Sequence, residues 1–371
     1  MRRSGIIERC LRSALPIIDY ALIVDTGSTD GTPELIERFL AANGVPGRVH
    51  HHEWRGFADA RTVALAQMRE VEHIDYALMI DADDVLSFSK DVAAFKQDLV
   101  SDVCWPSTVL DGLHYLRSAF ISNRRPFFYA GVVHEELYWG GEFATYQTAF
   151  GLTVTTHPDS HRAQDPMKFR KDADALIAAF ATEPNEVIRR RYTYYIGQCL
   201  RDHAILVGDL TCYREARHWY QLRAEFGGVG HEPYFANMMV ATCADKLGEP
   251  IDEVLEGFRR AIALEPDRAE APFEASRACV SRGDVRRAHE FAQLAATATR
   301  PAPFYQQEGW IYDWGAQDQL AATTFMNGDA GATIALIERI LADAPNIPDH
   351  ERQRMIGNLD HAIASLKAAT R

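Results

Sequence analysis

Paired cysteines, long apolar runs and basic charge are scarce in this sequence of 371 residues. Its six cysteines include no Cys-x-x-Cys pair, which excludes the spacing of zinc ribbons and thioredoxin-like redox sites, so we expect reduced and mostly buried thiols. No apolar run approaches the length of a membrane span. The apolar stretch behind Arg2 and Arg3 is broken by charged residues, so we predict no signal peptide and a cytoplasmic protein.

Positive charge is too sparse to attract polyanions in general. The chain has 39 Lys and Arg residues against 52 Asp and Glu residues, which gives a formal net charge of −13. We therefore expect no nucleic-acid partner and no general affinity for an anionic membrane. A protein of this charge that binds phosphates must use local basic groups or a metal ion. The chain length predicts two domains, at roughly 150 residues per domain.

Residues 1–165 show the alternation that is typical of an α/β domain. Two short apolar runs rich in β-forming residues, 20–24 and 76–80, are each followed by an Asp, and helix-like stretches lie between them. Residues 105–146 are rich in aromatic residues and lack a helical period, so we expect additional strands there. Strands that alternate with helices pack as a sheet covered by helices, which predicts an α/β fold for this part.

Residues 166–371 change to helix upon helix, with no convincing strand. A glycine followed by an acidic residue recurs along this part, before a helix-like segment each time. These glycines are Gly208, Gly248, Gly283 and Gly328. Their intervals lie near the roughly 34-residue period of tetratricopeptide repeats, in which paired antiparallel helices stack into a concave array. We predict such an all-α domain over residues 166–371, suited to a protein or peptide acceptor or to a homo-oligomer.

The sharpest candidate site is the acidic cluster Asp81-Ala82-Asp83-Asp84, which follows the apolar run 76–80. Three carboxylates this close repel one another unless a cation or tight hydrogen bonding compensates. The carboxyl end of a strand is also where open α/β sheets bind ligands. The cluster therefore indicates a divalent metal site, a solvated acidic turn or a helix N-cap formed by Asp84.

The second candidate is the loop of residues 25–32, which leads into a helix-like segment at Pro33. Its two glycines permit a tight backbone path, and its Asp, Ser and Thr side chains offer hydrogen bonds at the helix entrance. The loop has neither the Gly-Lys-Ser/Thr of a Walker motif nor the three-glycine dinucleotide pattern. It is either a well-capped turn or a contact to a ribose or base.

Three segments, in this order along the chain, resemble the family 2 glycosyltransferases of the GT-A fold. Residues 23–32 (IVDTGSTDGT) are similar to the family's nucleotide-binding loop, and residues 54–65 (WRGFADARTVAL) to its Ala-Arg-Asn segment, with Thr62 in place of Asn. Residues 79–84 (MIDADD) are similar to its Asp-x-Asp motif. The resemblance implies a Rossmann-like GT-A domain that transfers a sugar, with inversion, from a nucleotide diphosphate, in our reading a UDP-sugar, with Mn²⁺ or Mg²⁺ as cofactor.

The resemblance also assigns roles to residues of these segments. Asp25 would face the donor nucleotide, and Arg61 would support the donor pocket. Asp81 and Asp83 would position the complex of the metal with the diphosphate, with Asp84 as a third candidate.

A subgroup of the family joins this domain to tetratricopeptide repeats, and two further segments resemble it. Residues 126–135 (PFFYAGVVHE) are similar to its aromatic-Gly-x-Val-His-Glu segment, which makes Glu135 the candidate catalytic base that activates the acceptor. A neighbouring carboxylate, Glu136, would raise its proton affinity; alternatively both lie on an exposed strand edge. By resemblance to the subgroup's bridge into the helices, His157 is a candidate metal ligand and Arg162 a candidate diphosphate contact.

One departure from the family pattern leaves other functions open. Family members begin with a strand that forms part of the nucleotide pocket, whereas residues 6–15 already match the helix after it. Either the recorded start lies downstream of the true one, or part of the donor pocket is missing. The second case favours a non-catalytic tetratricopeptide interaction protein with a degenerate transferase domain. A nucleotidyltransferase with the same acidic metal site fits the 54–65 segment less well.

Overall fold

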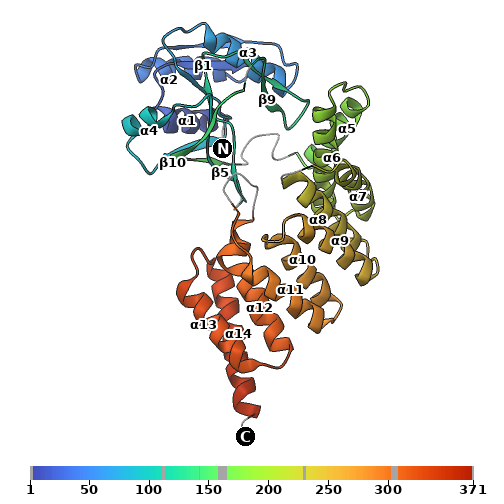
Figure 1. The fold of residues 1–371 in the computed structure, drawn as a ribbon. Helices are drawn as coiled ribbons and strands as arrows, with labels where there is room; N and C mark the ends of the chain where they lie inside the picture. The colour runs from blue at the N-terminus through green and yellow to red at the C-terminus, as the bar shows by residue number, and fades with distance from the viewer. Residues whose placement is uncertain are drawn as a thin grey trace. The chain divides into compact units, whose positions relative to one another are not determined.

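The computed structural model describes residues 3–110, 113–141, 143–157, 165–228, 231–301 and 308–369. The chain divides into two compact units, Met1–Tyr195 and Ile196–Arg371. The first unit contains a mixed sheet with helices, and the second consists of helices among its described residues (Figure 1). This confirms the predicted α/β fold followed by helical repeats. The last strand ends at Thr156, and the next helix begins at Lys168.

The strands of the first unit form one larger sheet and two smaller ones. Their bounds are β1 (Ala21–Asp25), β2 (Gly47–His51), β3 (Tyr76–Leu78), β4 (Asp84–Phe88), β5 (Val103–Leu110), β6 (Leu113–Leu116), β7 (Phe120–Ser122), β8 (Phe127–Ala130), β9 (Glu136–Trp139) and β10 (Tyr146–Thr156). The six-stranded sheet has the order β3-β7-β5-β10-β4, with β6 pairing β5. β1 and β2 pair in parallel, and β8 and β9 form an antiparallel pair. The additional strands expected over residues 105–146 are therefore present.

The helices of the first unit include the predicted helix behind the loop of residues 25–32. Their bounds are α1 (Arg3–Ala14), α2 (Thr32–Ala42), α3 (Phe57–Arg69), α4 (Val92–Asp98), α5 (Lys168–Phe180) and α6 (Glu186–Val207), of which α6 continues into the second unit. At the start of α2, Asp30 Oδ1 accepts hydrogen bonds from the backbone nitrogen and the hydroxyl of Thr32. Pro33 stands in the first turn, as expected of a helix start.

A cavity of about 900 Å³ lies along the edges of β1 and β3. Its lining includes the consecutive residues 20–24 and 73–82. Because successive side chains of a strand point to opposite faces of a sheet, a cavity lined by consecutive residues runs along the edges of these strands. Tyr20 and His73, which precede the two strands, make an edge-to-face contact with ring centroids 6.3 Å apart, so the strands start at the same end. Within the described residues, no strand pairs with β1 on the side away from β2, or with β3 on the side away from β7.

The second unit is a succession of helices, each packed against the next. Their bounds are α7 (Leu210–Glu225), α8 (His231–Lys246), α9 (Ile251–Leu264), α10 (Glu270–Ser281), α11 (Val285–Thr297), the π-helix η1 (Ile311–Gly315), α12 (Ala316–Met326), α13 (Ala330–Asp343) and α14 (Asp349–Ala369). Helices α7 to α14 contact one another in sequence order. None of the described helices combines the length and the apolar character that a membrane crossing requires. The six cysteines are buried and form no disulfide, as expected.

The repeated glycine-acidic pairs are the turns between these helices. Gly208, Gly283 and Gly328 have φ values of 71°, 73° and 87°, a left-handed conformation that glycine adopts without strain. The Asp that follows each glycine caps the next helix: Asp284, for example, accepts a hydrogen bond from the backbone nitrogen of Arg287. One residue ends a helix and its neighbour starts the next, which is why the pair marks each repeat in the sequence.

Two glycine-to-alanine substitutions test this explanation in opposite directions. Gly283→Ala is expected to lower the free energy of unfolding by about 1 kcal/mol, because a side chain disfavours the left-handed backbone, although nothing lies within 4 Å of the added Cβ. Gly357→Ala, inside α14 and equally uncrowded, should raise it by roughly 0.5–1 kcal/mol. Urea denaturation measures both. Equal effects of the two substitutions would refute the proposed role of the backbone.

The open edges of β1 and β3 predict a pattern of amide hydrogen exchange. The backbone nitrogen of Ala21 donates to the Pro46 carbonyl, and the Asp25 carbonyl accepts from the backbone nitrogen of His52. The backbone groups of the odd-numbered residues of β1 therefore bond toward β2, and the backbone N–H groups of Leu22 and Val24 point toward the open edge. We expect their amides to exchange faster than that of Ile23. Exchange measured residue by residue by NMR checks this. Equal protection of all three amides would mean that another segment pairs with this edge.

Candidate active site

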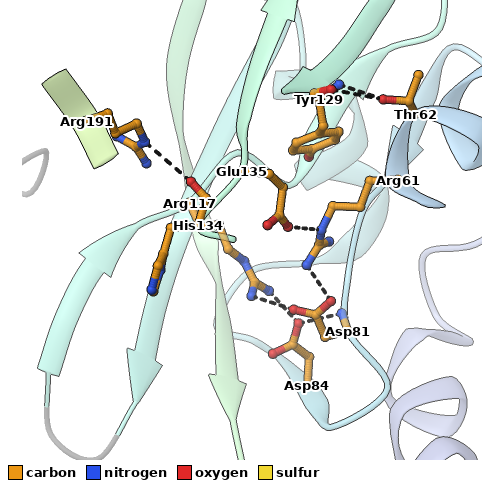
Figure 2. Close-up of polar contacts among 9 residues, drawn as sticks. All are labelled: Arg61, Thr62, Asp81, Asp84, Arg117, Tyr129, His134, Glu135 and Arg191. Atoms are coloured by element: carbon orange, nitrogen blue, oxygen red, sulfur yellow. Dashed lines mark hydrogen bonds and ion pairs between the residues drawn. The ribbon is translucent and has the colours of Figure 1, made fainter. Parts of the chain in front are cut away.

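Arg61 on α3 joins two of the predicted site residues. Its Nη2 donates a hydrogen bond to Asp81 Oδ1 at 2.7 Å, and its Nε donates to Glu135 Oε1 at 2.5 Å. Figure 2 shows the guanidinium group between the two carboxylates. Burial alone would lower the pKa of Arg61, but the charges of Asp81 and Glu135 raise it, so the side chain is a permanent cation. Asp81 and Glu135 lie 20 and 74 positions after Arg61 in the sequence, yet the three side chains form one ion-paired cluster.

The acidic turn after β3 is organised by Asp84, which has no solvent-exposed surface. Its Oδ2 accepts a hydrogen bond from the backbone nitrogen of Asp81 at 2.8 Å, and its Oδ1 accepts one from Thr156 Oγ1 at 2.7 Å. Asp84 begins strand β4, so the expectation that it caps a helix is wrong. Its carboxylate closes the turn from inside and does not face solvent.

Arg117, between β6 and β7, is a site residue that the sequence analysis missed. Its guanidinium pairs with Asp84 and reaches Asp81 Oδ2 at 3.4 Å (Figure 2). Together with Arg61 it compensates the repulsion within the acidic cluster, so that repulsion by itself does not require a metal ion. The need for a counter-charge was visible in the sequence, but nothing local pointed to a residue 33 positions further along the chain.

Asp83 and His157 are neighbours through the sheet. Asp84 and Thr156 are opposite one another in the β4–β10 pair, and the backbone nitrogen of His157 donates to the Asp83 carbonyl at 3.1 Å. Within the described residues, no group of three or more His, Cys, Asp or Glu side chains is arranged to hold a metal ion by itself. Arg162, the predicted diphosphate contact, lies outside the described residues.

Asp25, at the end of β1, is not part of the Arg61 cluster. Its carboxylate accepts hydrogen bonds from the backbone nitrogens of Gly27 and Ser28 and lies 3.3 Å from His51 Nδ1. Burial pushes its pKa up, but these hydrogen bonds outweigh burial and hold the pKa below its ordinary value. Asp25 therefore stabilises the predicted nucleotide loop as a charged group. His52 turns to Asp59 instead, so the consecutive histidines do not converge.

Glu135 and Glu136 diverge at the start of β9. Glu135 is turned to Arg61, whereas Glu136 pairs with Arg191 at 3.3 Å. The two carboxylates therefore have different cationic partners. His134, just before them, has a left-handed backbone with φ of 55°, and its ring stacks on Tyr195 with centroids 4.2 Å apart.

The 900 Å³ cavity opens beside this cluster. Its lining includes Thr26 of the nucleotide loop, Arg61, Asp81 and the aromatic pair of Trp54 and Phe57. Trp54 is 49% exposed, so part of its ring is accessible to solvent. A concave space with many apolar and a few charged residues in its lining is typical of a small-molecule site, and its volume is within the range of about 300–1,000 Å³ for such sites.

Two solved structures show a weak similarity to this chain. The crystal structure of MamA matches with a TM-score of 0.34 at 11% identity, covering 57% of this chain and 97% of that one. A putative kinesin light chain of Podosopora anserina with nearly identical TPR-like repeats matches with a TM-score of 0.33 at 14% identity, covering 55% of this chain and 90% of that one. At such scores the likeness adds nothing to what helices α7 to α14 themselves show.

Sequence comparison bears on the first unit. Residues 2–127 match the model of the family described as Glycosyl transferase family 2. The lipopolysaccharide core biosynthesis glycosyltransferase LpsC of Rhizobium meliloti (strain 1021) is 40% identical over 86 residues, which cover 23% of this chain and 30% of that protein. The chain thus spans under a third of this curated relative. Both matches confirm the resemblance drawn from the three motifs: the N-terminal part of this chain is similar to glycosyl transferase family 2, over the residues 2–127 that match the family model.

Proposed function

We propose that the protein is an inverting, metal-dependent glycosyltransferase that moves a sugar from a UDP-sugar to a protein, peptide or glycan acceptor. The observation that carries the proposal is the pairing of Arg61 with Asp81 and Glu135, in a domain similar to this family, where Arg61 and Asp81 line the cavity. The cavity supplies space for a nucleotide, and the charged cluster supplies groups for transfer at its end. The helical repeats are the surface for a protein or peptide acceptor.

The residues around the acidic turn fit a hard divalent ion, Mn²⁺ or Mg²⁺. Asp83 offers carboxylate oxygens, and His157 adjoins it across the strand pair. Both oxygens of Asp81 contact guanidinium groups, so Asp81 would join the metal by giving up one of these contacts. The donor diphosphate would provide the remaining ligands. When bound, the ion would act as a Lewis acid that neutralises the leaving diphosphate.

The remaining steps belong to side chains of the cluster and the loop. Thr26, with Asp25 fixing its loop, borders the space for the nucleoside. Arg61 holds Glu135 in a fixed orientation, with the carboxylate only 11% exposed. Glu135 accepts the proton of the acceptor hydroxyl while the acceptor oxygen bonds to the anomeric carbon and the bond from that carbon to the diphosphate oxygen breaks.

One observation favours a second candidate, a non-catalytic interaction protein with a degenerate transferase domain. The cavity continues between the open edges of β1 and β3, so the floor of the nucleotide site lacks strand pairing in the described residues. A domain in this condition would keep its fold and the helical repeats without binding a donor.

Calorimetric titration of UDP into the full chain separates the two candidates. We expect binding with Mn²⁺ that weakens when EDTA replaces the metal. Asp83→Ala should lower the affinity in Mn²⁺ by about tenfold or more, the effect of losing some 1.4 kcal/mol from a charged ligand. Asp174→Ala, which removes an exposed carboxylate paired with Arg170 on α5, is the matched control and should bind as the unchanged protein does.

Two results would count against the proposal. Absence of UDP binding with Mn²⁺ would favour the interaction protein. Equal weakening by Asp83→Ala and Asp174→Ala would show that the acidic turn has no special part in binding. Thermal unfolding of each variant verifies that the fold is intact.

A further inference from the structure

Arg117 and Arg61 contact the acidic turn at different oxygens. Arg61 donates to Asp81 Oδ1, whereas Arg117 contacts Asp81 Oδ2 and pairs with Asp84. Arg61 and Asp81 line the cavity, and the side chain of Arg117 is 24% exposed. Burial alone would lower its pKa, but these two carboxylates raise it, so it stays charged. Arg117 is thus linked to the cavity through the two carboxylates that it holds, Asp84 and Asp81.

The first residue that it holds is Asp84. A fully buried carboxylate is costly unless charge and hydrogen bonds compensate it. Arg117 supplies the charge, while the backbone nitrogen of Asp81 and the hydroxyl of Thr156 supply hydrogen bonds. Because Asp84 also closes the turn through its bond to the Asp81 nitrogen, the path of residues 81–84 depends on this pair.

The second residue is Asp81. Its Oδ1 accepts from Arg61 and its Oδ2 from Arg117, so two planar groups hold the two oxygens of one carboxylate from two sides. A guanidinium fork can bridge two carboxylates in a fixed geometry, whereas the point charge of a lysine cannot. Arg117 thereby links Asp84 to Asp81, and Arg61 continues the chain of ion pairs to Glu135.

We propose that Arg117 is a positioning residue of the donor site. It acts through the carboxylate of Asp81, which it aligns, and through the turn that presents Asp83, which it fixes. This inference rests on the proposed function, because it assigns Arg117 to the metal-dependent part of donor binding.

Replacement by lysine tests the role of the fork at constant charge. In Arg117→Lys, the UDP affinity measured in Mn²⁺ should fall by about tenfold, while the affinity measured in EDTA stays unchanged, because only the acidic turn is misaligned. The control is Arg48→Lys. Arg48 also bridges two acceptors, Gln67 and Glu70, but on the surface of the unit, and its replacement should change neither affinity.

If Arg117→Lys does not fold, a second variant tests the same role. The double substitution Arg117→Met with Asp84→Asn removes both buried charges together, and it should show the same selective loss in Mn²⁺. Unchanged affinity in either folded variant would overturn the inference, as would an equal loss in Mn²⁺ and EDTA, which indicates a merely structural role. If instead the proposed function is wrong, the unchanged protein itself will show no Mn²⁺-dependent UDP binding, which distinguishes that case from these two outcomes.

Discussion

The buried carboxylate of Asp84 is the constraint on which the candidate site depends. Breaking a buried ion pair by removing one partner costs about 3–5 kcal/mol, so Asp84 has to keep its cation. Arg117 from the β6–β7 link, the Asp81 backbone and Thr156 of β10 meet this need. Asp81 in turn contacts Arg61, and Arg61 contacts Glu135, so segments distant in sequence are brought together around the acidic turn.

Features with local causes could be predicted from the sequence. The apolar run 20–24 overlaps strand β1, and the run 76–80 contains strand β3. The glycine-acidic turns separate helices because glycine tolerates a left-handed backbone and Asp caps a helix. The family resemblance carried the remaining site assignments, and the structure brings Arg61, Asp81 and Glu135 of that set together. Each of these signals is contained in a few neighbouring residues.

Long-range pairings could not be predicted. Arg117 has no sequence pattern of its own, because its two partners precede it by 33 and 36 residues. The helix-cap reading of Asp84 failed because an acidic residue after a turn looks the same before a strand as before a helix. Glu135 and Glu136 were expected to act on each other, yet neighbours at a strand start point to opposite sides and find separate arginines.

A crystal structure with UDP and Mn²⁺ tests most directly whether the Arg61 cluster and the acidic turn form a donor site. We expect a manganese peak in anomalous scattering beside Asp83, with the diphosphate near Arg61 and the nucleoside near Thr26. Ordered UDP without manganese at Asp83, or a nucleotide bound away from this cavity, would contradict this expectation.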